Sequence, residues 1–326
     1  MRLLMLCFGV TLAVPAQPVI GNAGYSFPVP AYVAPGQVVT LFVQVSSTKL
    51  TAPVRAPGPT WPTTLGGVTV TYRQGSDQAA AILEVRPIST CLGVSPATGS
   101  TCNTLLSITA QMPFNMLTLC PLCGRVDIPA FILVTVDGVA SPMFSAQPLS
   151  DQVHILTACD ALIPDSTPRQ FAIAGPCPPM VTHVDGKLVS ATNPASSGEE
   201  LVAYAVGLGQ TDPPSTLGTP VYQAALATAA FAIDFDYHVN ATASQPLGPS
   251  LIGPNSNFPK PLFAGATPGY VGLYQFNFIV PPSPPGLTPC DDFTVLPPYA
   301  SAVRSNLTVS FGSVFSFDGA GICVKP

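Results

Sequence analysis

The sequence predicts an all-β protein, and three observations lead to that prediction. The chain has 39 prolines among 326 residues, and a proline inside a helix removes a hydrogen bond and clashes with the preceding turn. Between the prolines, apolar residues alternate with polar ones, which is the period of a β-strand with one buried face. Gly, Pro or Ser bounds most of these runs, as at the ends of strands.

Five runs are the clearest predicted strands, because each is rich in β-branched or aromatic residues and alternates over at least six positions. They are VVTLFVQV (residues 38–45), GVTVTY (67–72), FILVTV (131–136), FAIDFDYHV (231–239) and LYQFNFIV (273–280). Only the alanine-rich run ALATAA (225–230) has a weak helical pattern.

The first 16 residues, MRLLMLCFGVTLAVPA, form a predicted secretory signal peptide. They combine one positive charge, an apolar run and a small-residue cleavage site after Ala16. The apolar run of about 12 residues is shorter than the roughly 20 that a membrane-spanning helix needs. We therefore expect an exported chain, extracellular or at the cell surface, with no transmembrane segment after cleavage.

The charge content argues against nucleic acid as a partner. The formal net charge is −5 and charged residues are 8% of the chain, far below the ~25% of an average globular protein. Binding to phosphates requires a basic surface, which this composition does not supply.

Three segments recur in the same order in the two halves of the chain. APGQVVTLFV (34–43) is similar to SSGEELVAYAV (196–206), SITAQMPFN (107–115) to FNFIVPPS (276–283), and VTVDGVASPMF (134–144) to TVSFGSVFSF (308–317). A duplicated β domain leaves such a pattern. The sequence therefore predicts two tandem β-sandwich domains, residues 17–157 and 158–326, after the signal peptide 1–16.

Four longer stretches resemble a known family. They are NAG (22–24) followed by APGQVVTLF, LGGVTVTY (65–72), HVDGKLVSATNPASSGEELVAYAVGLGQTDPP (183–214) and PGYVGLYQFNFIVP (268–281). The chain resembles a Solibacter-type family of secreted proteins, common in Acidobacteria, that carries a C-terminal tandem of immunoglobulin-like (Ig-like) β domains. The resemblance implies an Ig-like fold for both halves and an extracellular location. It implies no activity, so it assigns no functional residue.

The segment GLGQTD (207–212) has the glycine spacing of a nucleotide-binding loop. Such a loop must open a helix, whereas Pro213 and Pro214 follow this one directly. We interpret Gly207 and Gly209 as the end of a strand, and we expect no nucleotide or other cofactor.

Eight cysteines stay in the chain after Cys7 leaves with the signal peptide, and export favours their complete pairing. The C-x-x-C spacing of Cys120 and Cys123 also occurs in thiol oxidoreductases and zinc sites, but no second ligand pair lies nearby in sequence. If each half closes its own bonds, neighbours in sequence pair. The predicted disulfides are Cys91–Cys102, Cys120–Cys123, Cys159–Cys177 and Cys290–Cys323.

Alternation in FAIDFDYHV places Asp234, Asp236 and His238 on one face of a strand. Two carboxylates and an imidazole are a possible set of metal ligands, and paired carboxylates also occur in glycosidases. A half-buried strand needs a polar outer face in any case. We expect a solvated face without a metal.

These observations favour a non-enzymatic module that binds a protein or a glycan at the cell surface or in the medium. No G-x-S-x-G motif occurs, and the chain has three histidines. Two alternatives stay open: a secreted hydrolase with a site between the domains, and a glycan-binding module that uses Trp61 or exposed tyrosines. Trp61, in PGPTWPTT, is either a loop contact residue or a cap on the core. The sequence assigns no catalytic, cofactor-binding or metal-binding residue.

Overall fold

The computed structural model describes residues 17, 19–23, 31–45, 48–89, 104–118, 128–157, 160, 178–237, 259–290 and 305–326. Every regular element in these ranges is a β-strand. The prediction of an all-β fold is confirmed. In these ranges no helix is long and apolar enough to cross a membrane.

The first half of the chain forms two sheets. One has the order β1-β3-β9-β8-β4, with bounds Val19–Ala23, Val38–Val45, Thr104–Gln111, Ala81–Ser89 and Val54–Arg55. The other has the order β2-β12-β10-β6-β5, with bounds Ala31–Val33, Phe144–Pro148, Ala130–Val136, Val68–Gln74 and Thr64–Leu65. Two short strands, β11 (Val139–Ala140) and β7 (Ser76–Ala79), pair with β10 and β6.

These two sheets enclose one core and therefore form a sandwich. Strands β6 and β10 alternate buried and half-buried positions along their whole length, as strands with one inward face must. Leu41 and Ile108 from the first sheet share a buried cluster with Tyr72 and Ile132 from the second.

The second half repeats this arrangement of two facing sheets. The larger sheet has the order β13-β15-β20-β19-β17-β16, and β14 also pairs with β15. Its bounds are His154–Ile155, Glu200–Val206, Tyr274–Ile279, Phe263–Ala266, Ala225–Ala227, Thr211–Asp212 and, for β14, Val181–His183. The smaller sheet has the order β18-β21-β22, with bounds Ala232–Asp236, Leu307–Gly312 and Phe317–Ile322.

Aromatic rings fill the core between these two sheets. Phe276 on β20 stacks on Phe311 of β21 with ring centroids 4.5 Å apart, and Phe231 meets Phe276 edge-on at 5.4 Å. Phe278 packs edge-on against Phe311 at 5.1 Å. Each such pair adds about 0.5–1.5 kcal/mol to the burial of the rings themselves.

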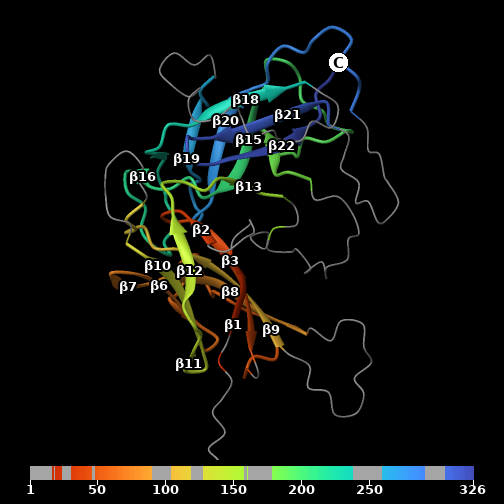
Figure 1. The fold of residues 1–326 in the computed structure, drawn as a ribbon. Helices are drawn as coiled ribbons and strands as arrows, with labels where there is room; N and C mark the ends of the chain where they lie inside the picture. The colour runs from red at the N-terminus through yellow and green to blue at the C-terminus, as the bar shows by residue number, and fades with distance from the viewer. Residues whose placement is uncertain are drawn as a thin grey trace, which may run out of the picture.

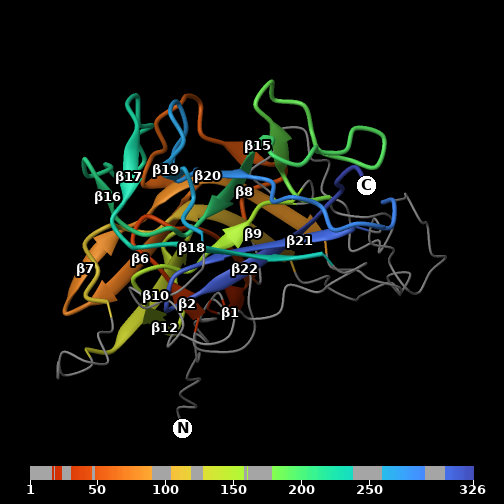
Figure 2. The same ribbon diagram turned by 90° about the horizontal axis from the view of Figure 1, so that it is seen from above.

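Six strands in each half pair in the same order. The sets are β3-β9-β8 with β6-β10-β12 in the first half, and β15-β20-β19 with β18-β21-β22 in the second. Gly36 and Gly198, which the sequence aligns, both have positive φ (69° and 79°) in the turn before β3 and β15. Figure 1 shows the two halves stacked end to end, the first below and the second above. Figure 2 views the same stack from above, so that the two halves overlap in the picture.

One sequence expectation is corrected here. Residues 225–227 form strand β17 and not a helix, because Ala225 and Leu226 pair with Ala266 and Gly265 of β19. The strands of the second half also begin before residue 158. His154 and Ile155 pair with Val206 and Ala205 of β15, and the division of the chain into domains at residues 157 and 158 stays a prediction.

A disulfide joins Cys290 to Cys323, directly after β22, as the pairing of sequence neighbours predicts. The other six cysteines lie outside the described residues, so their pairings stay predictions. They are Cys91, Cys102, Cys120, Cys123, Cys159 and Cys177.

Candidate binding sites at the junction of the two halves

Apolar side chains from both halves meet where the two sandwiches join. Val38, Leu156 and Val206 are buried there. The partly buried residues packed against these three are Trp61, Met180, Tyr204 and Leu273. We call these seven residues the junction cluster. It joins a loop of the first half to strand β15 and the chain before β20.

Hydrogen bonds fix the loop that carries Trp61 against the second half. The Trp61 amide donates to the Gly218 carbonyl at 2.8 Å, and the Gly218 amide donates to Gln111 Oε1 at 2.7 Å. Gln111 is 1% exposed, and its amide nitrogen also donates to the Gly36 carbonyl at 3.2 Å. A buried amide with both ends satisfied holds its neighbours in one arrangement.

A groove with a volume of about 420 Å³ runs along the junction cluster. We call it the junction groove. Its wall includes Trp61 and Arg55 from the first half, and Tyr204, Met180 and Tyr270 from the second. Small-molecule sites are concave, mostly apolar and of this size. The lining thus provides three aromatic rings and one positive charge.

The charge of Arg55 is only partly compensated. Its Nη1 lies 3.5 Å from Glu84 Oε2, whereas Arg86 Nη2 lies 2.5 Å from Glu84 Oε1. Charge-assisted hydrogen bonds are usually 2.7–2.9 Å long, so the contact of Arg55 is the weaker of the two. The Arg55 side chain is 36% exposed, and two guanidinium groups share one carboxylate.

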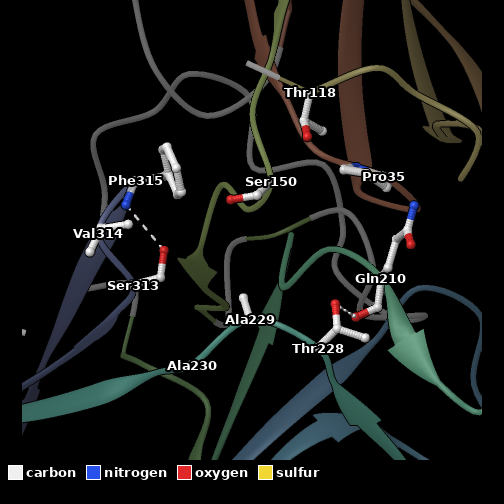
Figure 3. A pocket seen from close by; sticks show the side chains of 10 residues that line it. All are labelled: Pro35, Thr118, Ser150, Gln210, Thr228, Ala229, Ala230, Ser313, Val314 and Phe315. Atoms are coloured by element: carbon white, nitrogen blue, oxygen red, sulfur yellow. Dashed lines mark hydrogen bonds between the residues drawn. The ribbon is translucent and has the colours of Figure 1, made fainter. Parts of the chain in front are cut away.

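A second cleft, of about 430 Å³, lies at another part of the junction. Figure 3 shows its lining, in which Ser150, Ser313, Gln210, Thr228 and Phe315 contribute polar groups and one aromatic ring. We call it the serine cleft. Phe315 is 39% exposed, so one apolar surface faces several hydroxyl and amide groups.

A fully buried carboxylate lies beside the serine cleft. Asp151 is 0% exposed and accepts hydrogen bonds from Ser150, Ser313 and Ser316, at 2.9, 2.6 and 2.7 Å. Burial raises the pKa of Asp151, and the three serine hydrogen bonds act in the opposite direction. Because Ser313 and Ser316 lie between β21 and β22, Asp151 fastens the chain that links the halves to the second sandwich.

The glycines of GLGQTD have a structural role beside the chain that links the halves, residues 149–157, which we call the linker. Strand β15 ends at Val206, and Gly207 and Gly209 follow with φ values of 81° and 82°. A Cβ on Gly207 would lie 1.9 Å from the Gln152 carbonyl oxygen, and one on Gly209 would lie 2.1 Å from that of Ser150. The interpretation as a strand end is confirmed, and the glycines allow the linker to pass against it.

The two described histidines both join separate segments. His154 Nδ1 lies 3.1 Å from Asp318 Oδ2, and its Nε2 lies 3.4 Å from Asp160 Oδ1. Burial alone lowers the pKa of His154, but the two carboxylates outweigh it and raise the pKa to about 9. In the same way, Glu199 overcomes burial and raises the pKa of His183.

The predicted polar face of residues 231–239 is described in part. Phe231 and Ile233 are buried in the second core, and Phe235 and Tyr237 pack against it, which confirms the apolar face. Asp234 is half-buried, and burial with the nearby Asp236 raises its pKa, against a hydrogen bond from the Phe235 amide. His238 lies outside the described residues. Within the described ranges, no three His, Cys, Asp or Glu side chains are grouped as metal ligands would be.

The sequence left two roles open for Trp61, a contact residue in a loop or a cap on the core, and its position in the structure fits both. It packs on the junction cluster and also lines the junction groove. Sequence reasoning missed Arg55, Tyr204 and Tyr270, because no local pattern relates them to Trp61. The one sequence signal for these three residues was the scarcity of cations, since Arg55 is one of 11 Lys and Arg residues in the whole chain. No protein-family model matches this chain, and no curated protein matches it significantly.

Proposed function

We propose that this chain is an exported, non-enzymatic binding protein of two tandem Ig-like sandwiches that holds its ligand in the junction groove. The observation that carries the proposal is the lining of this groove. Trp61, Tyr204 and Tyr270 come from both halves and converge on one cavity of about 420 Å³. Aromatic rings give large contact areas at low entropic cost, and they are enriched where proteins bind ligands.

Three further observations support this reading. The identical pairing order of six strands in each half supports a duplicated sandwich. In addition, His154 and His183 hold carboxylates of other segments, so their contacts account for them as structural residues. The signal-like first 16 residues support export.

The serine cleft favours a second candidate function, the binding of a glycan. Sugars present apolar ring faces and hydroxyl groups, which suit the exposed ring of Phe315 beside Ser150, Gln210 and Thr228. A glycan array with Phe315→Ala and the unchanged protein tests this candidate. Specific glycan signals that disappear in the variant would favour the cleft over the groove.

Ligand capture tests the main proposal. The immobilised protein is incubated with culture medium and envelope extract of the producing cell, and the small molecules that it retains are identified by mass spectrometry. Tyr270→Ala removes a groove residue that is 58% exposed, and Tyr222→Ala removes a tyrosine outside the groove that is 75% exposed. We expect Tyr270→Ala to lose the captured molecules and Tyr222→Ala to retain them. Equal capture by both variants would contradict the proposal.

A further inference from the structure

The junction groove has a wall suited to an apolar molecule. Leu83, Leu156 and Val271 line it and are 6%, 3% and 5% exposed. Half-buried Met180 and Leu273 add to the same wall. An apolar body that replaces water here gains free energy in proportion to the apolar surface removed from solvent.

Among the described residues that line the groove, Arg55 alone carries a charge. Arg55, Arg86 and Glu84 together carry a net charge of one positive unit. Glu84 is engaged at short distance by Arg86 and at 3.5 Å by Arg55. Since a guanidinium group has five N–H donors in a fork that matches a carboxylate, Arg55 has donors left for a second anion.

We propose that the junction groove binds an apolar molecule that carries a single carboxylate, with the carboxylate at Arg55 and the apolar body against Trp61, Leu156 and Met180. This inference rests on the proposed function and names the ligand class. The net charge of one positive unit on Arg55, Arg86 and Glu84 balances one carboxylate, whereas a phosphate monoester brings nearly two negative charges. A neutral sugar would need several polar partners, while most of the described wall is apolar.

Trp61 provides the measurement, because it is the only tryptophan in the chain and lines the groove. Its fluorescence is recorded while octanoate or octanamide is added to the full chain. These probes have the same apolar body and differ in charge. We expect saturable changes with both, and an affinity at least about ten-fold higher for octanoate, since a hydrogen bond to a charged group is worth ~1.5–3 kcal/mol.

Variants of arginine separate the role of charge from that of fold. Arg55→Gln should bring octanoate down to the affinity of octanamide, and Arg55→Lys should retain part of the preference. Arg73→Gln is the matched control, because Arg73 is exposed and paired with Asp77 on the β6–β7 hairpin. It should bind as the unchanged protein does. Urea unfolding of each variant verifies that the fold is intact.

The outcomes distinguish this inference from the proposed function. If octanamide binds as tightly as octanoate, or if Arg55→Gln retains the preference, the assignment of a carboxylate is wrong while the groove stays a binding site. If neither probe binds but Tyr270→Ala still loses captured molecules, the ligand class alone is wrong. If neither probe binds and Tyr270→Ala loses nothing, the proposed function fails as well.

Discussion

Three glycines at the junction occupy positions where a side chain would strike the main chain of another segment. A Cβ on Gly207, Gly209 or Gly218 would lie 1.9, 2.1 or 2.6 Å from a carbonyl oxygen of Gln152, Ser150 or Trp61. All three have positive φ. These residues therefore determine how closely the linker and the Trp61 loop approach the second half.

The substitution Gly207→Ala separates this close approach from backbone strain. Alanine at positive φ costs about 1–2 kcal/mol, and the contact with the Gln152 carbonyl adds roughly 1–3 kcal/mol. The matched control is Gly186→Ala, since Gly186 has φ 83° and open space around it. In urea unfolding we expect Gly207→Ala to lose more than Gly186→Ala by at least about 1 kcal/mol. Equal losses would show that only the dihedral angle matters.

At the scale of elements, a short seam holds β13 against β22. The Ile155 amide donates to Asp318 Oδ2 at 2.8 Å, and His154 bridges Asp318 and Asp160. His154 is the ionisable group of this seam whose pKa lies well above its ordinary value. Its charge therefore makes the stability of the seam depend on pH.

We expect the free energy of unfolding to fall as pH rises from about 6.5 to about 9. The folded state holds the His154 proton with a pKa of about 9, against 6.5 ordinarily. The extra stability is thus complete below pH 6.5 and is lost as pH rises through 9. At 1.36 kcal/mol for each pKa unit, it amounts to at most roughly 3–4 kcal/mol. The free energy of unfolding, measured with urea at each pH, should fall less steeply with pH in His154→Gln than in the unchanged protein. An equal pH dependence in both proteins would contradict the assignment of this effect to His154.

The disulfide after β22 gives a second prediction at this scale. Cys290 and Cys323 are 33 residues apart in sequence, and closing such a loop restricts the unfolded chain by about 3–4 kcal/mol. The double variant Cys290→Ser and Cys323→Ser, unfolded without reductant, should lose free energy of that order. Asn306 constrains the same segment, because its side chain accepts a hydrogen bond from the Val324 amide and donates one to the Val324 carbonyl. A loss below about 1 kcal/mol would mean that the disulfide adds little to this constraint.

The sequence predicted elements where the determining pattern is local. Each of the five runs identified by alternation contains most of a strand, β3, β6, β10, β18 or β20, because a strand with one buried face repeats every two residues. The end of the fourth run, residues 238 and 239, lies outside the described residues. The junction groove was not predictable in this way. Trp61 packs with Met180 and Tyr204, which lie more than 100 residues further along the chain, and no periodic pattern connects them.

At the scale of the whole molecule, the boundary between the halves was the least predictable feature. The three pairs of similar segments lie within the two halves but leave the linker unassigned. In the structure, Asp151 and His154 of the linker contact Ser313, Ser316 and Asp318 of the second half. Those contacts depend on side chains far apart in sequence, so no local signal assigns Asp151 and His154 to one half or the other.

Two fragments of the second half test both its independence and this boundary. Residues 150–326 keep the buried hydrogen bonds of Asp151, the His154 seam and the pairing of β13 with β15. Residues 158–326 lose all three. We expect 150–326 to give a β-type circular dichroism spectrum and a cooperative urea transition under oxidising conditions, since it keeps the whole aromatic core.

The shorter fragment should unfold at a lower urea concentration, because the hydroxyls of Ser313 and Ser316 lose their buried partner and β15 loses a neighbour. Asp151→Ala in the longer fragment is the matched control, and it should lose part of the same stability. If residues 150–326 stay unfolded, the halves are not separate domains and the junction is part of a single core. If both fragments are equally stable, the linker belongs to neither sandwich, and the boundary at 157 predicted from the sequence is the better one.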